Sequence, residues 1–139
     1  MTYALAWPLQ EAVYQKLSGD AGLAALVAGI YDAAPHQVSE AGDGLYVTLG
    51  DEEVADWATA SDRGAVHTLA ISVHAPRRGF AEAKEVAGLI SDLLGASDLV
   101  LSRGRLVQAR FVSARTARAE NDALRRIDLR FRMVLEDDT

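Results

Sequence analysis

The stretch LRRIDLRFRMVLEDD, residues 124–138, decides the fold. Apolar side chains occupy every second position: Ile127, Leu129, Phe131, Met133 and Leu135. The positions between them are charged at Arg126, Asp128, Arg130 and Arg132. Alternation with a period of two predicts a β-strand with one face in a hydrophobic core and the other face in water. Three arginines on the wet face of a chain with a formal net charge of −6 need a separate explanation.

The composition is typical of a soluble globular protein. Of the 139 residues, 50% are hydrophobic and 24% charged, and we expect one domain spanning residues 1–139. The absence of cysteine excludes disulfides, thiolate catalysis and cysteine-bound zinc. No apolar run approaches the roughly 20 residues of a membrane span, and MTYALAWPLQEAV lacks the pattern of a signal peptide. A pI near 5.0 argues against a general nucleic-acid binder, which needs cationic surface to neutralise phosphate.

The N-terminal part predicts short helices. In WPLQEAVYQKLSGD, residues 7–20, apolar side chains recur at helical spacing, Pro8 suits a first turn and Gly19 suits the end. Asp20 is placed to cap a second short helix in AGLAALVAG, residues 21–29. A brief extended piece, IYDAAP, and a polar loop at residues 36–44 follow.

The rest of the chain predicts strands on either side of one long helix. LYVTLGDEEVADW, residues 45–57, is expected to be a strand interrupted at Gly50, and AVHTLAISVHA, residues 65–75, alternates regularly. FAEAKEVAGLISDLLG, residues 80–95, has the spacing of a helix. RLVQARFVSART, residues 105–116, predicts a strand with Val107, Ala109 and Phe111 inward. This order predicts an α+β fold, with a mainly antiparallel sheet packed against one long helix.

Nothing in the sequence predicts an enzyme, a metal site or a cofactor site. His67 and His74 differ in parity along one strand, so their side chains should leave opposite faces of the sheet. The nucleotide-binding and nucleophile-elbow motifs are absent. The acidic stretch Asp51, Glu52, Glu53 and Asp56 lacks the ligand spacing of a calcium loop, which favours a solvated run of charge over a cation site.

The two tryptophans have two interpretations each. Trp7, just before the first helix, is a hydrophobic staple or an exposed anchor for a partner. Trp57 follows the acidic strand, a place where aromatic residues often anchor interfaces. Tryptophan side chains are more often buried than exposed, so we expect Trp7 and Trp57 to be buried.

The order of these pieces resembles that of the small tail-completion proteins of long-tailed bacteriophages and gene transfer agents, often called tail terminators. The similarity spans nearly the whole chain, from LQEAVYQKLSGDAGLAALVAG to the closing RIDLRFRMVLE. Its most specific part is the region from His67 to Lys84, HTLAISVHAPRRGFAEAK. None of these motifs is catalytic, so the resemblance implies a structural protein of a virion or phage-like particle, assembled in the bacterial cytoplasm.

The resemblance implies a ring of six copies at the neck, where the head joins the tail. Such a ring stops polymerisation of the tail tube protein and docks the head–tail connector or stopper protein. DNA passes through its lumen without sequence-specific binding, and no membrane takes part.

A ring requires one patch of a subunit to meet a different patch of the next. We expect Arg126, Arg130 and Arg132 to meet carboxylates of a neighbouring copy or of the tube protein, with Trp57 close by. The candidate carboxylates are those of Asp51, Glu52, Glu53 and Asp56. A solvated sheet face is the alternative interpretation of the arginines. A small-ligand or regulatory binding domain, and more remotely a metal-dependent hydrolase, are the alternative functions.

Overall fold

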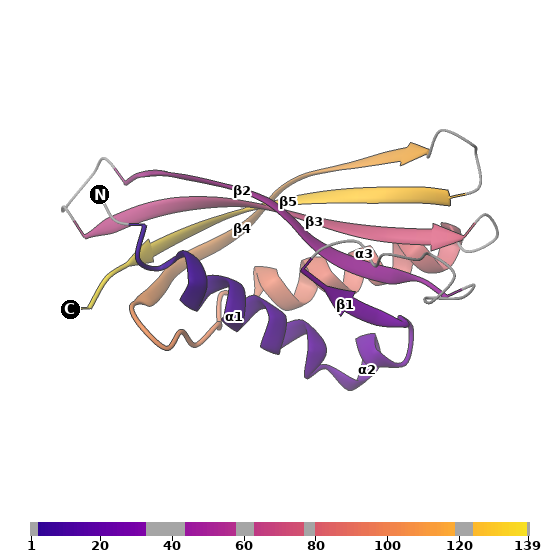
Figure 1. Cartoon of the computed structure of the whole chain (residues 1–139), viewed down its shortest axis with the longest axis horizontal. Coiled ribbons are helices and arrows are strands. Elements are labelled where there is room, and N and C mark those ends of the chain that lie inside the picture. Colours follow the sequence, from indigo (N-terminus) through magenta and orange to yellow (C-terminus); the bar gives the residue numbers. More distant parts are fainter. Residues whose placement is uncertain (1–2, 33–43, 58–62, 77–79, 119–123, 139) are drawn as a thin grey trace.

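The computed structural model describes residues 3–32, 44–57, 63–76, 80–118 and 124–138. Two helices come first, α1 (Ala6–Ser18) and the short α2 (Ala21–Ala24), and the strands β1 (Gly29–Tyr31), β2 (Tyr46–Asp56) and β3 (Gly64–Pro76) follow. Helix α3 (Phe80–Gly95) then leads to the strands β4 (Arg105–Arg118) and β5 (Leu124–Glu136). Figure 1 shows all three helices on one side of a long, twisted sheet.

The five strands form one sheet in the order β1-β2-β3-β5-β4. β1 runs parallel to β2, and every other pairing is antiparallel. β5 therefore lies inside the sheet, paired over most of its length with β3 on one side and β4 on the other. The α+β class and the mainly antiparallel sheet are confirmed.

The helices begin and end close to where the sequence predicts. α3 has the predicted bounds and buries Ala83, Val86, Ala87, Ile90 and Leu94 against the sheet. Asp20 caps α2 by accepting a hydrogen bond from the Leu23 N–H at 2.9 Å. α2 has only four residues, so the longer helix expected over residues 21–29 is wrong.

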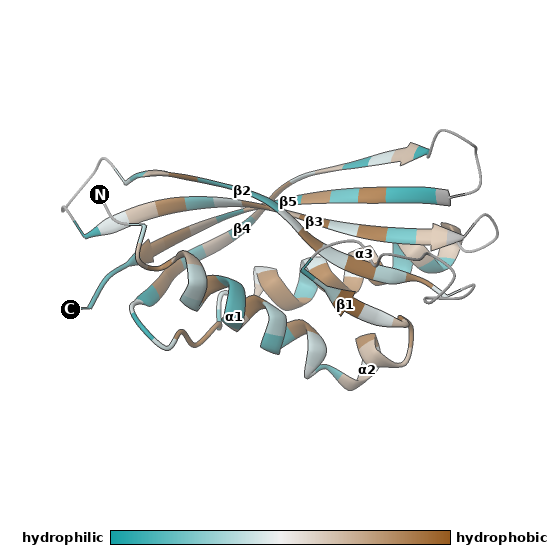
Figure 2. Cartoon of the chain, in the orientation of Figure 1, coloured by the Kyte–Doolittle hydropathy of each residue, from teal (hydrophilic) through white to brown (hydrophobic). Residues whose placement is uncertain are grey.

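The alternation that defines β5 has its predicted consequence. The five apolar side chains at odd positions are all at most 3% exposed: Ile127, Leu129, Phe131, Met133 and Leu135. Figure 2 shows the matching alternation of hydrophobic and hydrophilic bands along β5. These side chains form one core with α1, α3 and the inner faces of β2 and β3. We call the sheet side that contacts the helices the helix face and the other side the open face.

Two strands depart from the predicted pattern because of β-bulges. β2 is not interrupted at Gly50 but continues through an irregularity between Leu49 and Glu52. β4 shifts register between residues 106 and 108 and again between 111 and 113. Each extra residue changes which side chains face inward. Of the three residues predicted inward on β4, Ala109 is buried, and Phe111 lies opposite Phe131 on the helix face but is 42% exposed. Val107, which falls within the first irregularity, is 37% exposed.

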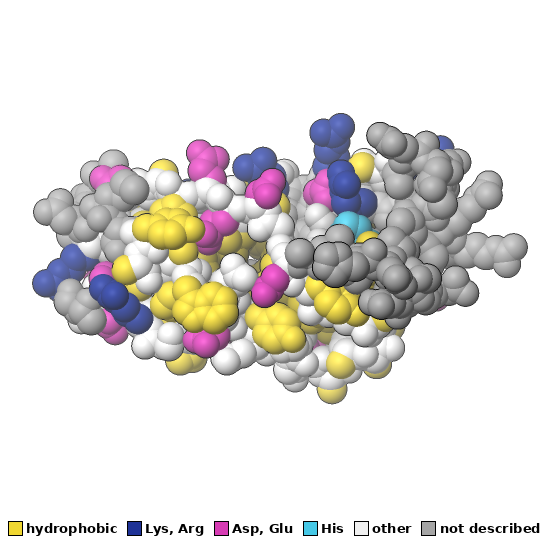
Figure 3. Space-filling model, in the orientation of Figure 1, with side chains coloured by type: hydrophobic (Ala, Val, Ile, Leu, Met, Phe, Trp, Pro, Cys, Tyr) yellow, Lys and Arg dark blue, Asp and Glu magenta, His cyan; other side chains and the backbone are white. Residues whose placement is uncertain are grey.

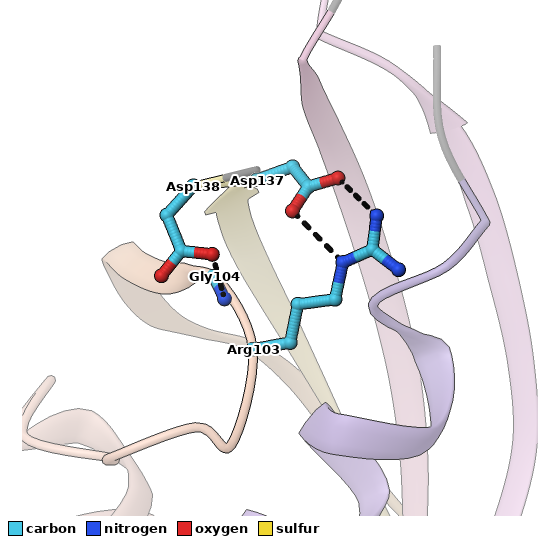
Figure 4. A network of polar contacts seen from close by, with 4 residues as sticks. All are labelled: Arg103, Gly104, Asp137 and Asp138. Carbon is cyan, nitrogen blue, oxygen red and sulfur yellow. Dashed lines mark hydrogen bonds and ion pairs between the residues drawn. The ribbon is translucent and has the colours of Figure 1, made fainter.

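The turn before β4 is fastened to the C-terminal residues (Figure 4). Arg103 Nε and Nη2 donate hydrogen bonds to the Asp137 carboxylate at 3.0 and 2.7 Å, which raises the pKa of Arg103. The Gly104 N–H donates to Asp138 Oδ1 at 3.0 Å. Gly104 has a φ of +76°, and an added Cβ would lie 2.8 Å from a backbone oxygen of β5. The Asp137 N–H also donates to the Arg63 carbonyl at 2.9 Å, so one residue contacts the segments before β3 and β4 at the same end of the sheet.

Two phenylalanines in edge-to-face contact provide a matched test of burial. Phe131 is fully buried, while Phe111, whose ring centroid lies 5.9 Å away, is 42% exposed. We expect Phe131→Ala to lower the free energy of unfolding by about 3–5 kcal/mol and Phe111→Ala by about 1 kcal/mol. Urea denaturation measures both values. Equal losses in the two variants would contradict this assignment of the core.

Candidate assembly surface

The open face presents the charged side chains of β5. Strand register sets Arg126 beside His74, Asp128 beside Ser72, Arg130 beside Ala70 and Arg132 beside Thr68, all on the same side. No helix in the described part of the chain covers this face (Figure 1). The wet face predicted from the sequence is therefore present.

Arg126 is engaged within its own subunit. Its Nε lies 2.9 Å from Asp128 Oδ1, and the Ser72 hydroxyl donates to the same carboxylate at 2.6 Å. The pair is exposed enough that its net contribution to stability is small. Arg126 is therefore less available to another chain than the sequence suggested.

Arg130 and Arg132 differ from Arg126 in lacking such a partner. Neither forms an ion pair with any residue for which the structure gives a position. Arg130 is exposed and lines a shallow hollow on the open face together with Asp51 and Glu53. Charges of both signs are therefore presented here without being neutralised.

The acidic stretch of β2 is divided between the two sides of the sheet. Glu53 lies opposite Thr68 on the open face, and Asp51 is exposed in the bulge. Glu52 lies on the helix face, where its Oε2 is 3.1 Å from Nδ1 of the fully buried His67. Asp56 is exposed at the end of the strand. The four carboxylates therefore do not form one cluster.

The two tryptophans lie in different environments. Trp57 is half-buried, with its ring against the backbone of Gly64 at the start of β3. Trp7 is 63% exposed, so the expectation of burial is wrong for this residue. It lies in the first turn of α1, and Tyr3, just before this helix, and Tyr14, within it, are 66% and 42% exposed. We call these three residues the aromatic row, and Figure 3 shows hydrophobic side chains gathered over α1.

Sequence reasoning missed two features of the surface. The spacing of Tyr3, Trp7 and Tyr14 is helical, but it was not recognised because the buried stripe of the same helix dominates the pattern. Arg110 and Arg115 on β4 were also missed. They lie opposite Arg132 and Asp128 and so extend the charged open face by one strand. Counting charges within RLVQARFVSART would have found them.

The histidines leave opposite faces of the sheet, as predicted. His67 lies on the helix face, and its Nε2 has no hydrogen-bond partner among the residues that the structure describes. His74 lies on the open face, stacked on Tyr46 with ring centroids 4.4 Å apart, and its Nε2 is 2.9 Å from the Thr48 hydroxyl. Burial lowers the pKa of His74, Arg126 lowers it further, and Asp128 acts in the opposite direction.

The described residues contain no group of three or more side chains suited to hold a metal ion. Within the same ranges, no helix combines the length and the apolar character that crossing a membrane requires. The surface instead offers charge, an exposed aromatic row and sheet edges, which are features of a protein that binds other proteins.

The comparisons with known proteins agree with this class. Residues 11–136 match the family described as tail completion protein gp17. No curated protein matches. A solved structure titled "Virion of native gene transfer agent (GTA) particle" contains a chain that is 50% identical, with a TM-score of 0.84, and the match covers 97% of this chain and 99% of that chain. The gp17 protein of bacteriophage SPP1 shares the fold at 16% identity, with a TM-score of 0.61 and coverage of 98% and 94%.

The chain belongs to the tail completion protein gp17 family. It is a structural tail protein and not an enzyme. This assignment decides against the small-ligand binding domain and the hydrolase that the sequence left open.

The position of His74 predicts how stability depends on pH. Its pKa is lower in the folded chain than the usual value of 6.5, so the unfolded chain binds a proton first as the pH falls. The stabilising contribution of neutral His74 is therefore complete above pH 6.5 and decreases as the pH falls towards the lower pKa. We expect His74→Gln, which keeps a polar group near Thr48, to lose less stability than the wild type between pH 7.5 and 5.5. Urea denaturation at several pH values measures the free energy of unfolding of both proteins. The same dependence on pH in the variant and the wild type would contradict this prediction.

Proposed function

We propose that the protein forms a ring of six copies at the head-proximal end of a tail tube. The ring ends tube polymerisation, docks the head–tail connector or stopper protein and lets DNA pass through its lumen. Membership of a tail completion family and the 50% identity to a chain of a gene transfer agent virion support this function. The protein then acts in the neck of a gene transfer agent or phage-like particle.

The open face is the observation that carries the proposal. Arg130 and Arg132 on β5 and Asp51 and Glu53 on β2 have no ion-pair partner among the described residues of their own subunit. Charges of both signs on one surface suit a contact in which unlike patches meet around a ring. Forked arginine–carboxylate pairs would fix the rotation of one partner relative to the next.

Apolar surface supplies most of the affinity in this proposal. An exposed ion pair contributes only ~0–1 kcal/mol, so charges select the partner more than they hold it. The large apolar side chains exposed on β4 are Val107, Phe111 and Val112, and the aromatic row lies on α1 and just before it. Aromatic residues and arginine are the types enriched where protein interfaces bind most strongly.

The net charge of −6 is compatible with a DNA conduit. A lining that neutralised many phosphates would bind DNA tightly and slow its passage. An acidic or mixed lining repels DNA weakly and lets it slide. Passage without sequence-specific contacts needs no base-reading element.

The ring itself is tested by mass. We expect the purified protein, incubated with tail tubes, to form an assembly of about six times the 14.9 kDa chain mass on the tube end. Native mass spectrometry of the released assembly measures the number of copies. Another fixed number of copies, or no binding to tube ends, would contradict the proposal.

The arginine contact is tested by reversing one charge. Arg130→Glu should lower the yield of particles with joined heads and tails at least about tenfold, because a like charge replaces an attraction at every copy of the ring. Electron microscopy of particles from producing cells gives the yield. The matched control is Lys84→Glu on the exposed side of α3, which should leave the yield unchanged. A normal yield from a folded Arg130→Glu protein would remove Arg130 from the contact.

A further inference from the structure

Among the described residues, each edge of the sheet is covered along one part and free along the other. On the β2 side, β1 pairs only with Tyr46, Val47 and Thr48. From Leu49 to Asp56 the outer edge of β2 has no strand partner among the described residues. A free strand edge presents unpaired N–H and C=O groups that can pair with another strand.

The β4 edge is closed in the opposite half. The Ser97 hydroxyl accepts a hydrogen bond from the Ala109 N–H at 3.0 Å and lies 3.2 Å from the Ala109 carbonyl oxygen. Ser97 therefore takes the place of a neighbouring strand at this point. From Arg110 to Arg118 no described strand lies beside the outer edge of β4.

The two free segments carry opposite charge. The free segment of β2, LGDEEVAD (residues 49–56), contains four acidic residues and no basic one. The free segment of β4, RFVSARTAR (residues 110–118), contains three arginines and no acidic residue. They have similar lengths and lie towards opposite ends of the molecule, as Figure 1 shows.

We infer that neighbouring copies join by sheet extension, with the free segment of β4 in one copy pairing with the free segment of β2 in the next. The inference rests on the proposed ring and identifies the contact that builds it. Backbone hydrogen bonds continue the sheet across the junction, as in other complexes formed by strand addition. The occupant of each free edge is therefore a second copy of this chain.

Strand register places the charged side chains where they can meet. Arg110 and Arg115 lie opposite Arg132 and Asp128, so both are on the open face. Glu53 is on the open face as well, and Asp51 lines the hollow there. When the sheet continues, all four side chains come to the same side of the junction. Neither arginine forms an ion pair with a described residue of its own subunit.

Apolar side chains meet on the other side of the junction. Phe111 lies opposite Phe131 on the helix face, and it is half-exposed because no described strand pairs with the outer edge of β4. On β2, Val54 lies opposite His67 on the same face and is also partly exposed. Sheet extension brings Phe111 of one copy towards Val54 and α1 of the next. Removal of this apolar surface from water supplies affinity that exposed ion pairs cannot.

The charges also prevent the wrong pairing. Two β4 edges would oppose arginine to arginine, and two β2 edges would oppose carboxylate to carboxylate. Only unlike edges attract, so each contact runs head to tail and a closed ring follows when the rotation closes. This selection accounts for the strict separation of acidic and basic residues between the two segments.

The test uses two complementary charge-reversed variants. The first carries Arg110→Glu and Arg115→Glu, and the second carries Asp51→Arg and Glu53→Arg. Each should lower the yield of joined particles at least about tenfold on its own. Cells that produce both variants should regain joined particles, because each reversed edge then meets a reversed partner. The control is Glu82→Arg on the exposed side of α3, which should give a normal yield.

The outcomes separate this inference from the proposed function. If either folded variant gives a normal yield of joined particles, the proposed edge pairing is wrong. It is also wrong if cells that produce both variants do not regain joined particles. Neither result contradicts the proposed ring. If the wild-type protein is absent from particle necks, the proposed function itself fails. Circular dichroism and urea denaturation confirm folding, and the neutral variants Arg110→Ala and Arg115→Ala, combined, replace the first variant if it does not fold. These neutral changes should weaken joining less than reversal does.

Discussion

The structure depends on β5 being paired on both sides. Because this strand lies between β3 and β4, each of its side chains has neighbours on two strands. Alternate side chains point to opposite sides of the sheet and therefore lie in different environments. One set fills the core above α1 and α3, with Phe131 and Leu129 nearly or fully excluded from water. The other set, which includes Arg130, has only the open face available. A shift of one residue would bury arginines and expose phenylalanine, so the register of the sheet is strongly determined.

The same constraint explains what the sequence could predict. The alternation around Phe131 and the helical spacing around Ile90 each repeat over more than ten residues, and the structure confirms both elements. Bulges leave no comparable pattern, because one extra residue changes the parity of all that follow. This is why Glu52 was grouped with Asp51, although the two lie on different sides of β2. Phe111 faces inward as predicted, but it is partly exposed because it lies on a strand at the edge of the sheet, which the sequence does not reveal.

The candidate surface was predicted in part. Arg130 and Arg132 were identified because their strand has the clearest pattern, and they lie on the open face. Whether an arginine on this face is available to a partner depends on ion pairs within its own subunit. Arg126 pairs with Asp128, two positions further along the same face, and the sequence pattern did not predict this pair. Strand order could not be derived from the chain, so the edge position of β4 and the significance of Arg110 and Arg115 emerged only from the fold.

The diagonal placement of the two free segments has a geometric consequence. If each copy contacts the next through segments near opposite ends, adjacent copies are displaced along their strands. A closed circle permits no net displacement after one circuit, so the strands must be inclined to its axis, as in a β-barrel. The inclination of the strands, the number of copies in the ring and the diameter of its lumen then depend on one another. The hydrogen bonds between the Ser97 hydroxyl and the Ala109 backbone set where the edge of β4 becomes free. They would thereby help determine the width of the passage.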